Sequence, residues 1–178
     1  MNKEMEKRLK SYVGKDILIS LYSDTDEPES FTLGYLLEMD ESNVLVNMVD
    51  SFGEENGFCT IILSDIFIFD QDKMYSEKMN NLFKLKNQSR KYIVNLKSNP
   101  IISFLENALE NKILVEVNED DNYVGYVIEF SIEFLELAII DNYGNDMGMA
   151  IIDMGHVGIL KCQNRYLKDL ELLYGGKQ

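Results

Sequence analysis

The feature that most constrains this chain of 178 residues is an internal repeat with a single spacing of 91 positions. Residues 34–39 (GYLLEM) recur as residues 125–130 (GYVIEF), and residues 50–53 (DSFG) recur as residues 141–144 (DNYG). The same spacing relates four positions of a later segment: Tyr75, Met79, Leu82 and Phe83 recur as Tyr166, Leu170, Leu173 and Tyr174. One offset that holds through glycine, aromatic and apolar positions indicates a duplicated structural unit.

Each copy has the pattern of a helix, five short strands and a second helix. Apolar residues at helical spacing predict the helices, and short segments rich in β-branched and aromatic residues, separated by polar turns, predict the strands. In the first copy we expect helices at residues 2–13 and 74–86 and strands at residues 16–22, 31–40, 44–50, 58–63 and 66–69. In the second copy we expect helices at residues 101–110 and 165–174 and strands at residues 113–117, 123–129, 134–141, 149–153 and 157–160.

This order predicts the fold class and the domain boundaries. Five short antiparallel strands with glycines at their bends favour a small, strongly bent barrel in each copy. We therefore predict a mainly β chain with flanking helices (α+β), built from two tandem five-stranded barrels. The first barrel with its helices spans residues 1–86, and the second spans residues 98–178. A basic connector, residues 87–97, joins them, and the sequence leaves open whether this connector is a helix or a linker.

Acidic residues are concentrated in the predicted barrels, and basic residues are concentrated between them. The net charge is −14; residues 16–72 contain 14 Asp and Glu, residues 113–160 contain 10, and neither range contains Lys or Arg. Residues 71–97 hold seven basic residues. Affinity for nucleic acid comes largely from Lys and Arg side chains that neutralise phosphates. We therefore expect the barrels to repel nucleic acid and to attract a basic protein.

The sequence favours a cytoplasmic protein with unpaired cysteines. It has no apolar run long enough to span a bilayer, and its charged beginning lacks the apolar core of a signal peptide. Cys59 and Cys162 occupy non-equivalent positions of the repeat, and Cys59 lies within an apolar strand pattern. We expect both to be small buried hydrophobic residues, with a disulfide or a metal-binding pair as the alternative.

Four residues of the first copy, Gly34, Leu36, Asp40 and Asn43, stand in the order of a known motif. Together with the helix and the five bent strands, they resemble the first motif of the Sm-like (LSm) family of small SH3-like barrels. The second copy departs further from that motif, because it keeps the first two positions and changes the last two: Gly125, Val127, Ser131 and Phe134.

The resemblance does not extend to the residues with which the family binds RNA. The family's second motif carries an Arg-Gly pair, whereas the matching positions here are Ser64-Asp65 and about Met154-Gly155. The family's RNA pocket also needs a stacking side chain and an Asn, and of this set only Asn43 is present. Asn43 is better explained as a turn residue that bonds its own backbone.

The resemblance also implies a mode of assembly. In the family, the fourth strand of one barrel pairs with the fifth strand of the next, so two fused barrels would mimic two neighbouring subunits. Pairing of the outer strand edges would add a homo-oligomer to the expected partners. Acidic residues near those edges, such as Asp70 and Asp153, would oppose such pairing.

The candidate partner-binding residues lie in equivalent loops of the two copies. Phe52 and Tyr143 are aromatic residues in glycine-containing loops, where they either anchor a partner or fill the core. Neighbouring acidic residues complete the candidate set: Asp50, Asp141, Glu54 and Glu55. We expect no catalytic residue, metal site or cofactor, and the single histidine, His156, has no counterpart in the first copy.

Two functional hypotheses follow from the sequence. The first is a non-catalytic, acidic interaction module that binds a basic protein, in the manner of a bacterial immunity protein or antitoxin. The alternative is an RNA-associated Sm-like protein that binds through basic residues of the connector and of the helix before it: Lys84, Lys86, Arg90 and Lys91. An enzyme is a third class, for which the sequence shows no recognisable catalytic motif.

Overall fold

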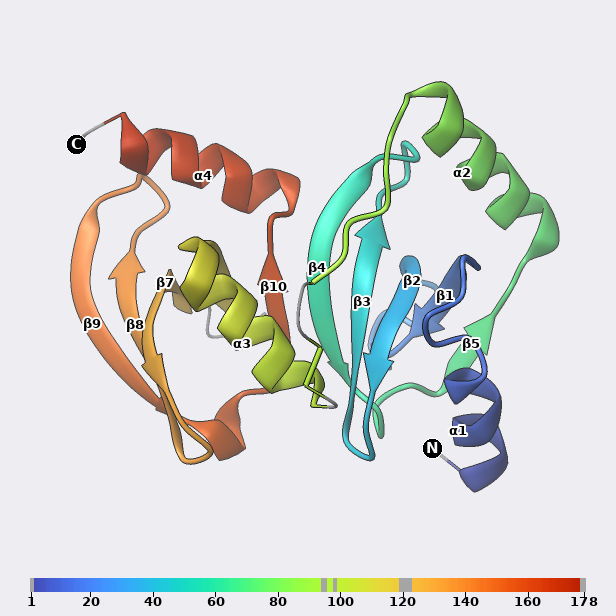
Figure 1. The fold of residues 1–178 in the computed structure, drawn as a ribbon, viewed down its shortest axis with the longest axis horizontal. Helices are drawn as coiled ribbons and strands as arrows, with labels where there is room; N and C mark the ends of the chain where they lie inside the picture. Colours follow the sequence, from blue (N-terminus) through green and yellow to red (C-terminus); the bar gives the residue numbers. More distant parts are fainter. Residues whose placement is uncertain (1, 94–95, 98, 119–122, 177–178) are drawn as a thin grey trace.

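The computed structural model describes residues 2–93, 96–97, 99–118 and 123–176. These residues form one antiparallel sheet of ten strands, flanked by helices (Figure 1). The mainly β, α+β class predicted from the sequence is therefore confirmed. Parts of the connector (residues 94–95) and of the predicted loop at residues 118–122 (residues 119–122) lie outside the described residues.

The elements follow the predicted order. The first half, residues 2–86, contains α1 (Lys3–Lys10), β1 (Ile19–Tyr22), β2 (Thr32–Met39), β3 (Asn43–Val49), β4 (Glu55–Ile62), β5 (Ile68–Asp70) and α2 (Lys73–Leu85). The second half, residues 99–176, contains α3 (Pro100–Asn111), β6 (Leu114–Val117), β7 (Tyr123–Phe130), β8 (Phe134–Ile140), β9 (Asp146–Asp153), the 3-10 helix η1 (Met154–His156), β10 (Leu160–Cys162) and α4 (Arg165–Gly175).

Several predicted boundaries differ from the structure by three residues: α1 ends earlier, β1 begins later, and β4 and β9 begin earlier than expected. The last strand begins three residues later than expected, because Met154–His156 form a 3-10 turn whose Gly155 N–H is capped by the Asp153 carboxylate at 2.7 Å. The sequence left open whether the connector is a helix or a linker, and its described residues contain no helix or strand. It is an extended linker that runs down from the end of α2 between the two halves (Figure 1).

The repeat of the sequence is also a repeat of strand register. Gly34 pairs with Met48 and Gly125 pairs with Ile139, so both pairs are related by the same spacing. A register shift follows at the same place in both halves, between Leu36 and Glu38 and between residues 127 and 129. The glycines are required here, since a Cβ at Gly34 would lie 2.5 Å from the Asn47 carbonyl oxygen.

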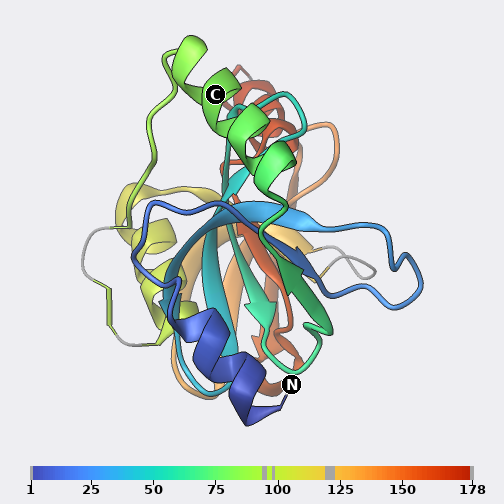
Figure 2. The same ribbon diagram turned by 90° about the vertical axis from the view of Figure 1, so that its right-hand side faces the viewer.

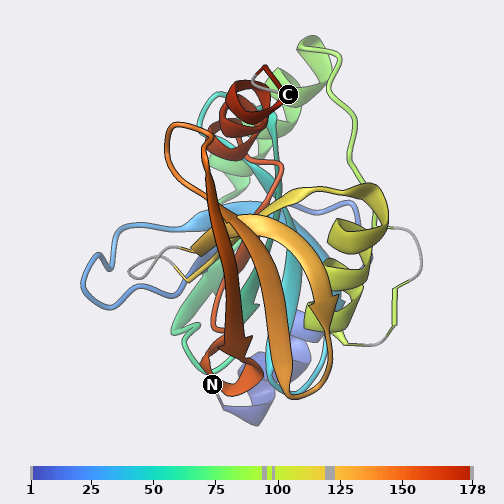
Figure 3. The ribbon, with the colours of Figure 1, turned by 90° about the vertical axis from the view of Figure 1, so that its left-hand side faces the viewer.

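The two halves are joined by pairing of the fourth strand of the first half with the fifth strand of the second, the arrangement that the resemblance to the Sm-like family implied. β4 pairs with β10 of the second half, with Cys59 opposite Lys161 and Phe58 opposite Cys162. The strand order is therefore β5-β1-β2-β3-β4-β10-β6-β7-β8-β9, and the sheet is open. The outermost strands are β5, on the side seen in Figure 2, and β9, on the side seen in Figure 3.

The hydrophobic core of the second half extends onto the first half. Phe104, Leu105 and Ala108 of α3 belong to one buried cluster with side chains from β6–β8 and β10 and with three residues of the first half: Leu37, Leu45 and Phe58. A separate cluster lies inside the first half and includes Leu9 of α1. The shared cluster removes apolar surface of both halves from water, which stabilises their contact by roughly 1.5–3 kcal/mol per fully buried large side chain.

Both cysteines are buried and free, as the sequence predicted, and the disulfide alternative is wrong. Cys59 belongs to the core inside the first half, and Cys162 belongs to the shared core on the other face of the sheet. Burial in apolar surroundings raises the pKa of the Cys59 thiol to about 12.

Candidate protein-interaction site

The two loops that carry the predicted partner-binding residues have the same construction. The Asp50 carboxylate accepts hydrogen bonds from the backbone N–H groups of Phe52 and Glu54, both at 2.9 Å. The Asp141 carboxylate does the same for the N–H groups of Tyr143, at 2.9 Å, and Asn145, at 2.8 Å. The aspartates therefore shape their loops, and the aromatic side chains that follow them are exposed rather than used as core plugs.

In the first half, basic residues of the chain itself surround this loop. Glu54 pairs with Lys86 at 2.6 Å and with Arg165 at 3.3 Å. Glu55 has a nearly buried side chain, 5% exposed, and pairs with Lys91 at 2.9 Å and with Lys168 at 3.6 Å. These cations come from the end of α2, the connector and α4, so the cluster lies where the two halves meet.

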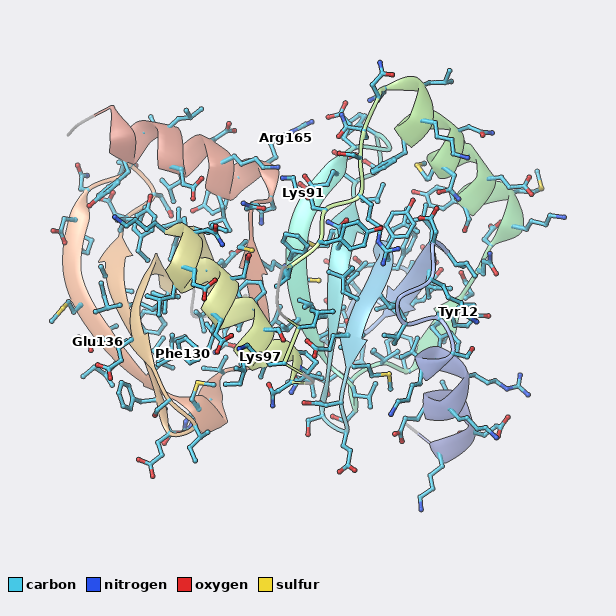
Figure 4. The ribbon with its side chains drawn as sticks, viewed as in Figure 1. Tyr12, Lys91, Lys97, Phe130, Glu136 and Arg165 are labelled. Atoms are coloured by element: carbon cyan, nitrogen blue, oxygen red, sulfur yellow. The ribbon has the colours of Figure 1, made fainter. Side chains whose placement is uncertain are left out.

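The charges of this junction cluster act on one another. The hydrogen bond and the charge of Lys86 lower the pKa of the Glu54 carboxyl, and Arg165 adds to the effect. The Arg165 guanidinium also lies 5.6 Å from the centre of the Phe52 ring, within cation–π range. Figure 4 shows Arg165 and Lys91 reaching into the region between the halves. Asp50, Phe52, Glu54 and Glu55 are thus occupied by the chain's own α4, α2 and connector.

The residues of the RNA hypothesis are placed by the same contacts. Lys86 and Lys91 are paired with Glu54 and Glu55, and Arg90 lies between two tyrosine rings with its side chain 9% exposed. Lys84 is exposed on α2. Three of the four candidate cations therefore already hold a partner within the chain.

The first half shows what covers the outer face of its sheet. Leu37, Leu45 and Phe58 of β2, β3 and β4 belong to the shared core under α3, and Leu37 and Phe58 are only 6% and 2% exposed. The edge of β4 is closed by β10. In this half, the outer face and the fourth-strand edge together form an intramolecular protein interface.

The corresponding surface of the second half is uncovered. The counterparts of those residues at the 91-residue spacing are Ile128, Glu136 and Met149, and Ile128 and Met149 are 48% and 71% exposed. In the described residues, β9 pairs only with β8, so its other edge is free. Figure 3 shows β9 with no helix in front of it. We call this face, together with the β9 edge, the open side.

The open side is chemically different from its covered counterpart. At the internal interface, Thr60 accepts a hydrogen bond from the Leu160 N–H at 3.0 Å, and Asn56 accepts one from the Arg165 N–H at 3.1 Å. The β9 counterparts are Ile151 and Met147, both exposed and apolar. A partner of the open side therefore meets apolar side chains where β10 and α4 meet polar ones.

Acidic residues accompany the apolar side chains of the open side. Glu136 lies at its centre, and Figure 4 shows this residue on the far side of the second half from the junction. Asp146 and Asp153 stand at the two ends of β9. No Lys or Arg occurs between residues 113 and 160. Exposed methionine and isoleucine side chains next to negative charges are typical of a surface that binds a basic protein.

The residues of the open side were missed by the sequence predictions. The spacing of 91 residues shows that Leu45 is replaced by Glu136. This difference identifies a covered and an exposed surface only when the pairing of β4 with β10 is known. The strand pairing implied by the Sm-like resemblance was the one signal in the sequence that could have identified the free fourth-strand edge.

Comparison with protein-family models, with curated proteins and with solved structures finds no match to this chain. Among the described residues, no helix has the length and apolar character needed to cross a bilayer. Nor do His, Cys, Asp and Glu of the described part form a group of three or more that could hold a metal ion.

Proposed function

We propose that this chain is a non-catalytic interaction module of two Sm-like units, which binds a basic protein through the open side of its second half. The observation that carries the proposal is the contrast between equivalent surfaces. The outer face and fourth-strand edge of the first half are buried against another part of the chain, whereas the same surface of the second half is exposed. A surface with this geometry accepts a strand at its edge and apolar side chains on its face.

Charge indicates the kind of partner. Glu136, Asp146 and Asp153 lie on or beside the open side, and net charge of this sign speeds association with basic proteins. An immunity protein or antitoxin that covers a basic toxin has this chemistry. The alternative, RNA binding, has less support, because Lys86, Arg90 and Lys91 are engaged by the chain's own carboxylates and aromatic rings.

The test is capture of basic proteins by the full chain and by two matched variants. Met149→Lys places a positive charge on the open side, and Met74→Lys makes the same change at an exposed methionine of α2. We expect the unaltered chain and Met74→Lys to retain a basic protein that moderate salt releases, and Met149→Lys to lose it. Equal retention by both variants, or retention of oligonucleotides in place of protein, would contradict the proposal.

A second copy of the chain is the other candidate for the open side, because β5 is the counterpart of β10 and, in the described residues, pairs only with β1. In such an assembly β5 would pair with β9 of the next chain. Light scattering over a range of concentrations distinguishes the two cases. A mass that rises from 20.6 kDa toward its multiples, and that stays at 20.6 kDa in a Met149→Lys variant, would assign the open side to self-association.

A further inference from the structure

The connector places one arginine in a specific site on the outer face of the first half. The Arg90 guanidinium lies 4.9 Å from the ring centres of both Tyr35 and Tyr92. It donates a hydrogen bond to the Lys15 carbonyl oxygen at 3.1 Å and lies 3.9 Å from the Asp16 carboxylate. The planar cation is therefore held by two aromatic faces, one carbonyl group and one carboxylate.

The guanidinium in this site is largely removed from water, although Tyr92 and Asp16 beside it are exposed, and its burial strengthens the contact with Tyr35. The Arg90 side chain is 9% exposed. Burial is the main cause that raises the pKa of Tyr35 to about 12, and Asp16 acts in the same direction while Arg90 opposes it. Cation–π contacts contribute about 2 kcal/mol when desolvated, compared with 0.5–1 kcal/mol at exposed sites. The backbone next to Arg90 is fixed as well, because the Lys91 N–H donates to Asn47 Oδ1 at 3.2 Å.

The second half has an open groove at the equivalent place. Tyr126 is the counterpart of Tyr35, and Tyr174 is the counterpart of Phe83, whose ring packs edge-on against Tyr35. Tyr126 and Tyr174 line a groove of about 580 Å³ together with Ile128 and Glu171. Leu109 of α3 and the neighbouring Lys112 complete its lining. In the described part of the chain, no guanidinium lies over Tyr126 as Arg90 lies over Tyr35.

A carboxylate is present in this groove, as it is in the occupied site. Burial and the charge of Glu171 both raise the pKa of the Tyr126 hydroxyl, which places Glu171 in the same electrostatic role that Asp16 has for Tyr35. One Glu171 oxygen accepts the Leu114 N–H at 2.9 Å, which fixes the side chain at the groove. The groove also runs onto Ile128, and so is continuous with the open side.

We infer that this groove receives an arginine side chain, presented by an extended segment of the basic partner protein, in the way that the connector presents Arg90 to Tyr35. This inference rests on the proposed function and adds the chemistry by which the partner is recognised. The guanidinium would stack on Tyr126 beside Glu171, and the apolar residues that follow it would continue onto Ile128 and Met149.

Two differences from the occupied site predict a weaker interaction and provide substitutions that should strengthen it. Lys112 lines the groove and repels a cation. Ala138 stands at the position of Asn47, so the backbone of a bound segment lacks the hydrogen bond that Lys91 makes. Lys112→Glu should therefore tighten binding of an arginine segment, and Ala138→Asn should tighten it as well.

The experiment uses a fluorescent peptide with the sequence of residues 87–93 (NQSRKYI), added to the full chain and followed by fluorescence anisotropy. We expect weak, saturable binding that Tyr126→Leu reduces by about 2- to 30-fold, the range that corresponds to one cation–π contact. A peptide with Arg90 replaced by Ala should show a similar loss. Tyr123→Leu, on the same strand outside the groove, is the matched control and should leave binding unchanged.

If Tyr126→Leu impairs folding, Lys112→Glu still tests the inference. We expect this variant to bind the peptide more tightly, and impaired folding cannot produce a gain in affinity. Dependence on Tyr126 also shows that the peptide has not simply replaced the chain's own connector over Tyr35. Absence of saturable binding to both the unaltered chain and Lys112→Glu would overturn the inference. If the peptide does not bind but basic proteins are still captured in a manner that depends on Met149, the proposed function stands and only the arginine groove is refuted. If neither the peptide nor a basic protein binds, both the arginine groove and the proposed function are refuted.

Discussion

The two glycines Gly57 and Gly148 provide a matched test of the difference between the covered and the free strand. They are counterparts in the repeat and have similar backbone conformations, with φ of +79° and +88°. A Cβ on Gly57 would collide with the carbonyl oxygen of Cys162, at the end of β10, and lie 2.5 Å from the carbonyl carbon of Gln163, the residue that follows. A Cβ on Gly148 would meet no atom within 4 Å.

The structure therefore predicts unequal effects of the same substitution. An alanine in the left-handed region costs about 1–2 kcal/mol, and the loss of glycine's freedom in the unfolded chain offsets about 0.4–1 kcal/mol of that. Gly148→Ala should therefore lower the free energy of unfolding by about 1 kcal/mol. Gly57→Ala carries the same cost plus the displacement of packed backbone, for which overpacking at about 1–3 kcal/mol is the appropriate scale.

Urea unfolding followed by circular dichroism measures both variants against the unaltered chain. We expect Gly57→Ala to be the less stable variant by about 1–3 kcal/mol. Equal destabilisation by the two substitutions would refute the reasoning, because it would mean that β4 is as open as β9. Greater destabilisation by Gly148→Ala would mean that β9 is the strand with a packed neighbour.

Three further predictions concern the junction and the cores. Glu55→Ala should destabilise the chain by about 1–3 kcal/mol in urea unfolding, because it leaves the buried Gly57 N–H without its acceptor and removes the partner of Lys91 and Lys168. Arg165→Gln, at a side chain 63% exposed, should cost less than about 1 kcal/mol. The urea midpoint should hold steady from neutral pH to about pH 9 and fall between pH 9 and 12. Folding raises the pKa of Cys59 from 9.0 to about 12, so the unfolded thiol ionises first; a midpoint that rises in this range would contradict the assignment. Iodoacetamide at pH 8.5 should alkylate neither Cys59 nor Cys162 in the native chain and both in urea, as mass spectrometry can show; rapid native labelling would mean that the cores are open.

Much of the architecture could be predicted from the sequence, because it follows from local patterns. β-branched segments separated by polar turns identified the strands, and the common spacing of Gly34 and Gly125 correctly related the two halves. The last strand was placed too early because the Asp153 side chain caps a 3-10 turn, an interaction that periodicity does not detect. The joining of the halves into one sheet depends on contacts between residues about 100 positions apart, such as Leu160 with Thr60.

The candidate site was harder to predict, because charge composition does not show which charges meet. The acidic loop at Asp50 and Glu54 and the basic connector were both recognised, but the structure pairs them with each other through Lys86, Lys91 and Arg165. Ile128 and Met149 look like ordinary core residues in the sequence. Their exposure follows from their position on the last strands of the sheet, beyond which the described structure holds no further layer.

Amide hydrogen exchange of the full chain tests most directly whether the fourth strand of the first half is closed while that of the second half is open. We predict slow exchange for the amides around Cys59 and Cys162, because the strands β4 and β10 that carry them pair across the junction. We predict fast exchange for the alternate β9 amides that face away from β8. A basic protein bound to the chain should slow the β9 amides selectively. Slow exchange of all β9 amides in the isolated, dilute chain would contradict the account, because the surface that we assign to a partner would already be covered.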